Sequence, residues 1–247
     1  MAGHNKWSKI KHRKAVVDKR RGKAWTKISK ALIVAARHGG PDPDANLALR
    51  YAIDEARYAN MPRDTVERAI RKGAGGEDTS TYENIRYEGY GPGGVAVIIE
   101  TLTDNRARTV GDIRLAFSDH GGNIGGSGCV AYMFASKGRI VVAAEGLVED
   151  SVMEKAIEAG ATDVEPLDEG DDEHPPSWII WTQVASFASV KTNVEKAGLP
   201  VIDAGLVMVP DNHIAVAGEQ ADTIAALIEA LEDLDDVQKV YSNASFE

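Results

Sequence analysis

The sequence has a single cysteine, Cys129, among 247 residues, so no disulfide can form within the chain. A lone thiol is typical of proteins from a reducing compartment, and we expect a cytoplasmic protein. Long apolar runs are also missing, since none approaches the ~20 residues that cross a bilayer. The basic N-terminus is not followed by an apolar stretch and a small-residue cleavage site, which argues against a secretory signal. We therefore expect no membrane partner.

Motifs for metal or covalent chemistry are equally scarce. The six histidines are scattered, and HExxH, paired CxxC and aspartate-rich calcium-loop patterns do not occur. Ser127 lies in GGSGC rather than in the GxSxG elbow of hydrolases. The glycine-rich stretch GGNIGGSG at residues 121–128 leads into an apolar strand pattern without GK[ST], so we interpret it as a flexible connector or bulge. We predict that the protein is not an enzyme, needs no cofactor or metal and has no small-molecule substrate.

What the sequence has instead is a strong separation of charge along the chain. The formal net charge is −10, yet residues 1–72 carry 18 Lys and Arg against 7 Asp and Glu, whereas residues 73–247 carry 10 against 31. The first 30 residues hold eleven of the cations and one acid, Asp18. Such a split indicates a polyanion partner for the basic segment and a body that repels the same polyanion. A merely solvated, charge-rich tail is the alternative.

A basic arm, residues 1–22, and one face of the helix that follows form the candidate contact surface. The arm has few apolar side chains and no sustained period, so we expect it to be flexible when unbound. Lysine and arginine neutralise phosphates without precise geometry, while Trp7 either stacks on a base or anchors the arm. We identify no recognition helix with base-reading side chains. The candidate nucleic-acid-binding residues are Lys6, Trp7, Lys9, Lys11, His12, Arg13, Lys14, Lys19, Arg20, Arg21, Lys23, Lys27, Lys30 and Arg37.

Residues 23–76 show the pattern of a small helical domain. The first helix is predicted over residues 23–38, with an apolar stripe at Trp25, Ile28, Leu32 and Ala36 opposite the basic face. A second helix is expected to be capped by Asp42, with Pro43 at its first helical position. A third, short helix opens at Pro62 and ends at the glycines of residues 73–76.

From residue 82 the pattern changes to alternating strands and helices. IRYEGY, a GPGG turn and VAVIIETL predict a hairpin, and Asp104 or Asn105 is expected to cap a helix that runs to about Phe117. CVAYMF is predicted to be a strand, and residues 138–202 contain a complete βαββαβ order. We therefore predict an α+β fold with two βαβ-type domains after the helical one. The first is built from residues 82–135 and 203–247, and the second, residues 138–202, is a ferredoxin-like unit inserted in it.

Several long stretches resemble the YebC/PmpR family. They are MAGHNKWSKIKHRKAVVDKRRGKAWTKISKAL, GGPDPDANLALRYAIDEARYANMPRDTVERAI, YEGYGPGGVAVIIETLTDNRARTV and GGNIGGSGCVAYMF, with a weaker likeness around DVQKVY. The resemblance implies a cytoplasmic, non-enzymatic protein of three domains, one of them inserted in another. It also implies a probable transcriptional regulator that binds DNA, although some relatives, including a mitochondrial translational activator, act at the ribosome.

Two functions follow as hypotheses from the residues and the resemblance together. The first is a DNA-binding regulator of transcription that uses the basic arm and helix. The second is a ribosome-associated translation factor that places the same arm in ribosomal or transfer RNA. Charge alone does not separate them, and nothing in the sequence indicates an oligomeric state.

Overall fold

The computed structural model describes residues 17–75, 81–143, 147–168 and 176–246. Most of the predicted arm and the acidic stretch at residues 169–175 lie outside these ranges. The chain divides into two compact units, one of residues 1–134 with 210–247 and one of residues 135–209. N-terminal helices precede mixed α/β sheets, as the predicted α+β class requires. The domain boundaries given above stay a proposal.

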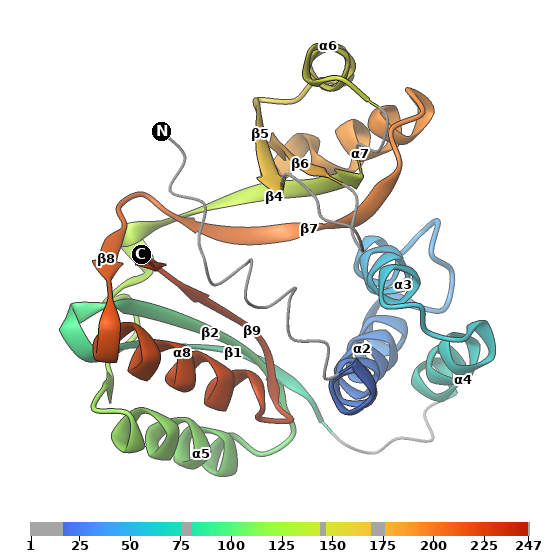
Figure 1. Cartoon of the computed structure of the whole chain (residues 1–247). Coiled ribbons are helices and arrows are strands. Elements are labelled where there is room, and N and C mark those ends of the chain that lie inside the picture. The colour runs from blue at the N-terminus through green and yellow to red at the C-terminus, as the bar shows by residue number, and fades with distance from the viewer. Residues whose placement is uncertain (1–16, 76–80, 144–146, 169–175, 247) are drawn as a thin grey trace. The chain divides into compact units, whose positions relative to one another are not determined.

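Three helices open the first unit: α2 (Val17–Gly39), α3 (Leu47–Tyr58) and α4 (Arg63–Ala74) (Figure 1). Leu32 and Ala36 of α2 are buried against Leu49 of α3, as the apolar stripe predicts. Helix α2 begins six residues before the predicted Lys23. The apolar period does not extend into that first turn, but lysine and arginine are good helix formers, so propensity alone prolongs the helix.

The junction between α2 and α3 depends on Asn46. Its Oδ1 accepts a hydrogen bond from the Leu49 amide at 3.1 Å, and its Nδ2 donates to the carbonyl oxygens of Ala35 at 2.7 Å and Gly40 at 2.9 Å. The prediction that Asp42 caps the second helix was wrong. Asp42 instead accepts from the Asp44 amide at 2.9 Å and closes a turn before the helix begins.

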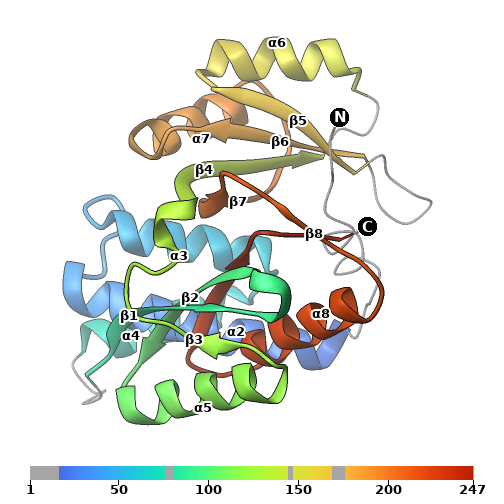
Figure 2. The same cartoon turned by 90° about the vertical axis from the view of Figure 1, so that its left-hand side faces the viewer.

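The predicted hairpin and helix are confirmed as β1 (Glu83–Tyr90), β2 (Ala96–Thr103) and α5 (Arg106–Asp119). They build a four-stranded sheet in the order β3-β1-β2-β9, with β3 (Asn123–Ile124) and β9 (Val237–Ser242). Helix α5 and helix α8 (Gly218–Glu232) lie on the same face of this sheet (Figure 2).

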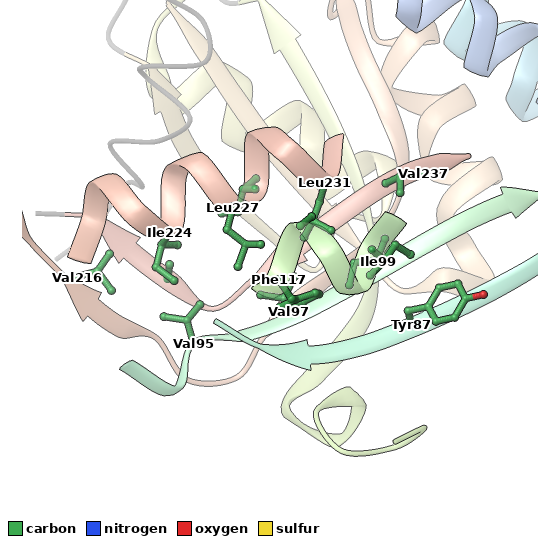
Figure 3. Packing of buried hydrophobic residues seen from close by; sticks show 14 of the residues in the cluster. Tyr87, Val95, Val97, Ile99, Phe117, Val216, Ile224, Leu227, Leu231 and Val237 are labelled. Atoms are coloured by element: carbon green, nitrogen blue, oxygen red, sulfur yellow. The ribbon is translucent and has the colours of Figure 1, made fainter. Parts of the chain in front are cut away.

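The core of this layer comes from the inward positions of each element. Val97 and Ile99 of β2 meet Phe117 of α5 and Leu227 and Leu231 of α8, all fully buried (Figure 3). Packing of this kind needs only apolar periodicity in each element, which is why the sequence predicts it. The short parallel pair β8 (Ile214–Val216) and β10 (Ala244–Phe246) was not predicted, because three residues show no period.

The second unit has the predicted ferredoxin-like order β4 (Phe134–Ala143), α6 (Glu149–Ala159), β5 (Asp163–Asp168), β6 (Ser177–Thr182), α7 (Phe187–Lys196) and β7 (Val201–Pro210). Its sheet runs β5-β6-β4-β7. Ile140 and Ile180 from neighbouring strands are fully buried, and Phe187 of α7 is nearly so. The prediction of a strand over CVAYMF was wrong, because residues 131–133 form a 3₁₀ turn and the strand begins at Phe134.

Replacing Asn46 by alanine tests the junction. Asn46→Ala removes one amide acceptor and two amide donors from a buried site, so we expect the free energy of unfolding in urea to fall by about 2 kcal/mol. The matched change at exposed Asn212, Asn212→Ala, is expected to stay within about 0.5 kcal/mol of the unmodified protein. Equal effects of the two changes would contradict a structural role for Asn46.

Candidate nucleic-acid interface

The structure describes the side chains of four of the fourteen predicted contact residues. Lys19, Arg20 and Arg21 belong to the first turns of α2, and their side chains lie outside the described part. Seven more lie entirely outside the described residues: Lys6, Trp7, Lys9, Lys11, His12, Arg13 and Lys14. The four with described side chains are Lys23, Lys27, Lys30 and Arg37, all on α2.

Lys23, Lys27 and Lys30 form a lysine stripe, because residues four and three positions apart lie on one side of a helix. All three ammonium groups reach residues 232–236, which we call the acidic turn because four of its five residues are acids. Lys27 Nζ donates to the Glu232 carbonyl oxygen at 2.6 Å, and Lys30 Nζ donates to that of Asp235 at 3.1 Å. Lys23 Nζ lies 3.0 Å from Asp233 Oδ1 and donates to the Asp233 carbonyl oxygen at 3.4 Å.

The acidic turn attracts these lysines for two reasons. Helix α8 ends at Glu232, and the last carbonyl groups of a helix have no partner within it and carry the negative end of its dipole. The acidic side chains that follow add formal charge at the same place. Cations near a helix C-terminus are stabilising for this reason.

The lysine stripe therefore has partners within the chain itself, although its side chains stay partly exposed. The residues that satisfy it lie about 205 positions away in the sequence, so no local pattern reveals them. Arg37 lies half-buried in the last turn of α2, away from this contact along the helix. That any of these four residues binds nucleic acid stays a prediction.

Asp236, the last residue of the acidic turn, is buried at the centre of a polar cluster. Its Oδ1 accepts from Lys30 Nζ at 2.9 Å, and its Oδ2 accepts from Arg108 Nη2 at 2.7 Å. The hydroxyls of Thr109 and Thr103 donate to Oδ2 at 2.8 and 3.2 Å. The cluster thus joins α2, β2 and α5 to the start of β9.

Sequence reasoning missed this cluster. The structure pairs Arg108 with Asp104 at 2.8 Å and with Asp236 at 2.7 Å. The spacing of four residues between Asp104 and Arg108 on a helix start was the available signal. Asp236 itself gives no signal, since it is one acid among several in its segment.

The contact between the lysine stripe and the acidic turn shifts the pKa values of Asp236 and Lys27 for different reasons. Burial raises the pKa of Asp236, but hydrogen bonds from Arg108 and Lys30 outweigh it and hold the pKa at about 2. Burial lowers the pKa of Lys27, and the attraction of Glu232 and Asp233 offsets only part of that effect. The contact therefore favours the charge on Asp236 and disfavours the charge on Lys27.

The glycine-rich loop also binds an anion, and the anion is part of the chain. Glu88 Oε1 accepts from the Gly128 amide, and Oε2 accepts from the amides of Val130 and Ala131, each at 2.8 Å. Burial raises the pKa of Glu88, yet the three amides together bring it below its ordinary value. The interpretation of residues 121–128 as a flexible connector or bulge stays a prediction, but the Gly128 amide at the end of this stretch is held by the buried carboxylate of Glu88.

Other kinds of site find no support in the described ranges. None of the helices there is long and apolar enough to span a membrane. Among the same residues, His, Cys, Asp and Glu side chains do not gather in groups of three that would suit a metal ion.

Comparison with known proteins gives consistent matches over nearly the whole chain. A family model described as the TACO1/YebC protein N-terminal domain matches residues 5–76, and one described as the TACO1/YebC second and third domain matches residues 82–244. A "Probable transcriptional regulatory protein" of Bordetella petrii is 51% identical over 247 residues, covering 100% of this chain and 99% of that protein. One of Desulforamulus reducens is 47% identical over 245 residues, covering 98% of each.

A solved structure shows the same fold. The crystal structure of a conserved hypothetical protein from Aquifex aeolicus superposes with a TM-score of 0.84 at 46% identity and covers 96% of each chain.

Replacing Asp236 by asparagine tests the buried cluster. The pKa of about 2 lies below the ordinary 3.8, so ionised Asp236 contributes about 2 kcal/mol that is fully present above about pH 4 and is lost as the pH falls toward 2. Asp236→Asn leaves Arg108 without its buried partner and is expected to lower the free energy of unfolding by about 3 kcal/mol at pH 6.

The pH dependence makes that test specific. Urea unfolding at pH 3 is expected to show a difference between the two proteins that is smaller by about 1 kcal/mol, because Asp236 of the unfolded chain, with its ordinary pKa of 3.8, is then mostly protonated while the native carboxylate stays ionised. Asp119→Asn, at an exposed position, is the control and is expected to stay within about 0.5 kcal/mol at both pH values. A difference that does not shrink with acid would contradict the assigned role of Asp236.

Replacing Glu88 by glutamine tests the glycine-rich loop. Gln keeps one acceptor oxygen and turns an NH₂ group toward backbone amides, so we expect a loss of about 2 kcal/mol and faster hydrogen exchange at the amides of Gly128, Val130 and Ala131. Glu83→Gln, at an exposed position of the same strand, is the control. If the two variants exchange equally fast at these amides, Glu88 does not order the loop.

Proposed function

Because the chain belongs to the TACO1/YebC family, we propose that it is a nucleic-acid-binding regulator of gene expression, and specifically a DNA-binding regulator of transcription. The relatives named above carry the name of probable transcriptional regulatory proteins, which supports a regulatory role. We further propose that it acts in the cytoplasm, without a cofactor and without catalysing a reaction.

One observation carries the proposal: the separation of charge. Residues 1–21 contain eight Lys and Arg and one acid, in a chain of net charge −10. A segment of this kind binds a phosphate backbone through counterion release. The lysine stripe that follows already has partners in the acidic turn, so the first contacts belong to the arm. The proposed arm contacts are Lys6, Trp7, Lys9, Lys11, His12, Arg13, Lys14, Lys19, Arg20 and Arg21.

A translation factor that binds ribosomal or transfer RNA is the second candidate. Lys19, Arg20 and Arg21 belong to a helix that continues without a break into the body. A basic helix neutralises phosphates without reading bases, and basic segments of this kind also bind structured RNA. This candidate uses the same arm and differs only in the nucleic acid that it contacts.

The salt dependence of binding tests the proposal. If about six to eight arm residues neutralise phosphates of a duplex DNA probe, the logarithm of the association constant should fall with the logarithm of salt concentration at a slope of about −5 to −7. Fluorescence anisotropy over a range of potassium concentrations measures this slope. A flat response would overturn the proposed backbone contact.

A matched pair of variants localises the contact. The triple change Arg13→Gln, Lys14→Gln and Arg20→Gln should make the slope less steep by about 3.

The control removes the same charge from exposed positions of α4: Arg63→Gln, Arg68→Gln and Arg71→Gln. This control variant should have a slope within about 0.5 of that of the unmodified protein, because these residues make no phosphate contact in the proposal. Competition in the same assay by a ribosomal RNA hairpin decides between the candidates. An RNA that displaces the DNA at far lower concentration than duplex competitor would favour the translation factor.

A further inference from the structure

The lysine stripe has the dimensions of a nucleic-acid contact. Seven residues separate Lys23 from Lys30, which at 1.5 Å per residue is about 10 Å along α2. One strand of B-DNA carries a phosphate charge every 3.4 Å along the axis, so the stripe spans about three phosphate-to-phosphate steps. The three lysines thus have the spacing to serve as a continuation of the arm.

The acidic turn offers the stripe a row of oxygen atoms much as a phosphate backbone would. The carbonyl oxygens of Glu232, Asp233 and Asp235 each accept from one lysine. Carboxylates of Asp233 and Asp236 lie 3.0 and 2.9 Å from the ammonium groups of the first and last lysine. Five contacts are therefore made to oxygens that carry formal or partial negative charge.

We propose that the acidic turn is an internal mimic of a nucleic-acid backbone, which occupies Lys23, Lys27 and Lys30 until a bound nucleic acid displaces it. The inference rests on the proposed function and adds a regulatory contact to it. The arm binds the nucleic acid first. The lysine stripe joins the interface only after its contacts with the acidic turn are broken.

Two features of the contact make it suited to exchange. Burial disfavours the charge on Lys27 more than the neighbouring acids favour it, so transfer to a phosphate relieves an existing cost. When Lys30 leaves, Asp236 retains the hydrogen bonds from Arg108, Thr109 and Thr103. Release therefore leaves no buried carboxylate without a partner.

The mimic lowers nucleic-acid affinity, since binding must first break its contacts. Coupling of this kind typically changes affinity by about 5- to 150-fold. Removing charges from the acidic turn should therefore raise the affinity for nucleic acid by the same factor. The increase should occur only when the three lysines are present.

The test is a variant with the charges of the acidic turn removed: Glu232→Gln, Asp233→Asn and Asp235→Asn. It spares Asp236, whose removal would disturb the core. The control removes the same charge from exposed positions elsewhere in the first unit: Asp112→Asn, Asp119→Asn and Asp222→Asn. Both variants lose three negative charges, so the long-range electrostatic attraction of the protein to a polyanion increases by the same amount in each.

We expect the acidic-turn variant to bind duplex DNA at least fivefold more tightly than the control at equal salt. Adding Lys23→Gln, Lys27→Gln and Lys30→Gln should abolish that gain. Equal affinities of the two charge variants would overturn the inference, and so would a gain that survives loss of the lysines.

The outcomes separate this inference from the proposed function. If the unmodified protein shows no arm-dependent binding, both the proposed function and the mimic are overturned. If binding depends on the arm but the acidic-turn variant and its control bind DNA with equal affinity, only the mimic is overturned. Thermal unfolding checks that each variant is folded. If the triple variant does not fold, Asp233→Asn replaces it, because Asp233 is exposed and its carboxylate lies 3.0 Å from Lys23 Nζ. It should then bind more tightly than Asp119→Asn, and equal binding would overturn the inference.

Discussion

The carboxylate of Asp236 is the constraint on which the first unit depends. It is buried with one face toward Lys30 of α2 and the other toward Arg108 of α5. A buried carboxylate is tolerated only when charged and polar partners surround it, so the three elements that supply them are held together. Arg108 supplies the charge that compensates this carboxylate from α5, and the hydroxyls of Thr109 and Thr103 add hydrogen bonds to the same oxygen. The position of α2 against the sheet follows from this requirement as much as from apolar packing.

Two sequence features that suggest capture of an outside anion turn out to have an anion of their own. The glycine-rich loop offers its amides to Glu88, and the lysine stripe offers its ammonium groups to the acidic turn. The residue types indicate an anion partner for the lysine stripe, whereas the glycine-rich stretch is interpreted as a flexible connector or bulge. The identity of the partner was not accessible, because in each case it comes from a distant part of the chain.

The same distinction explains how far the sequence predicts the fold. Elements with a clear local signature, such as the hairpin around Gly91 and helix α5, are predicted closely, since turn residues, apolar runs and helix caps can all be read from neighbouring residues. Asp42 and Asn46 show the limit. Both are good caps by residue type, but only Asn46 also meets the carbonyl groups of Ala35 and Gly40 at the end of the preceding helix. A cap is chosen by tertiary geometry when two candidates lie close together.

The fate of the cations bears on how the protein can meet a polyanion. Residues 73–247 carry 31 acids against 10 Lys and Arg, so the body as a whole repels phosphate, and the lysine stripe on α2 is neutralised by that body. Residues 1–21 combine eight cations with one acid and so carry the strongest positive charge density of the chain. Attraction confined to one end, with repulsion from the rest, orients a protein on its ligand before any specific contact forms. An internal acidic turn sharpens this arrangement, because it removes cations next to the arm from non-specific encounters. The three lysines become available only to a ligand that binds firmly enough to displace the acidic turn.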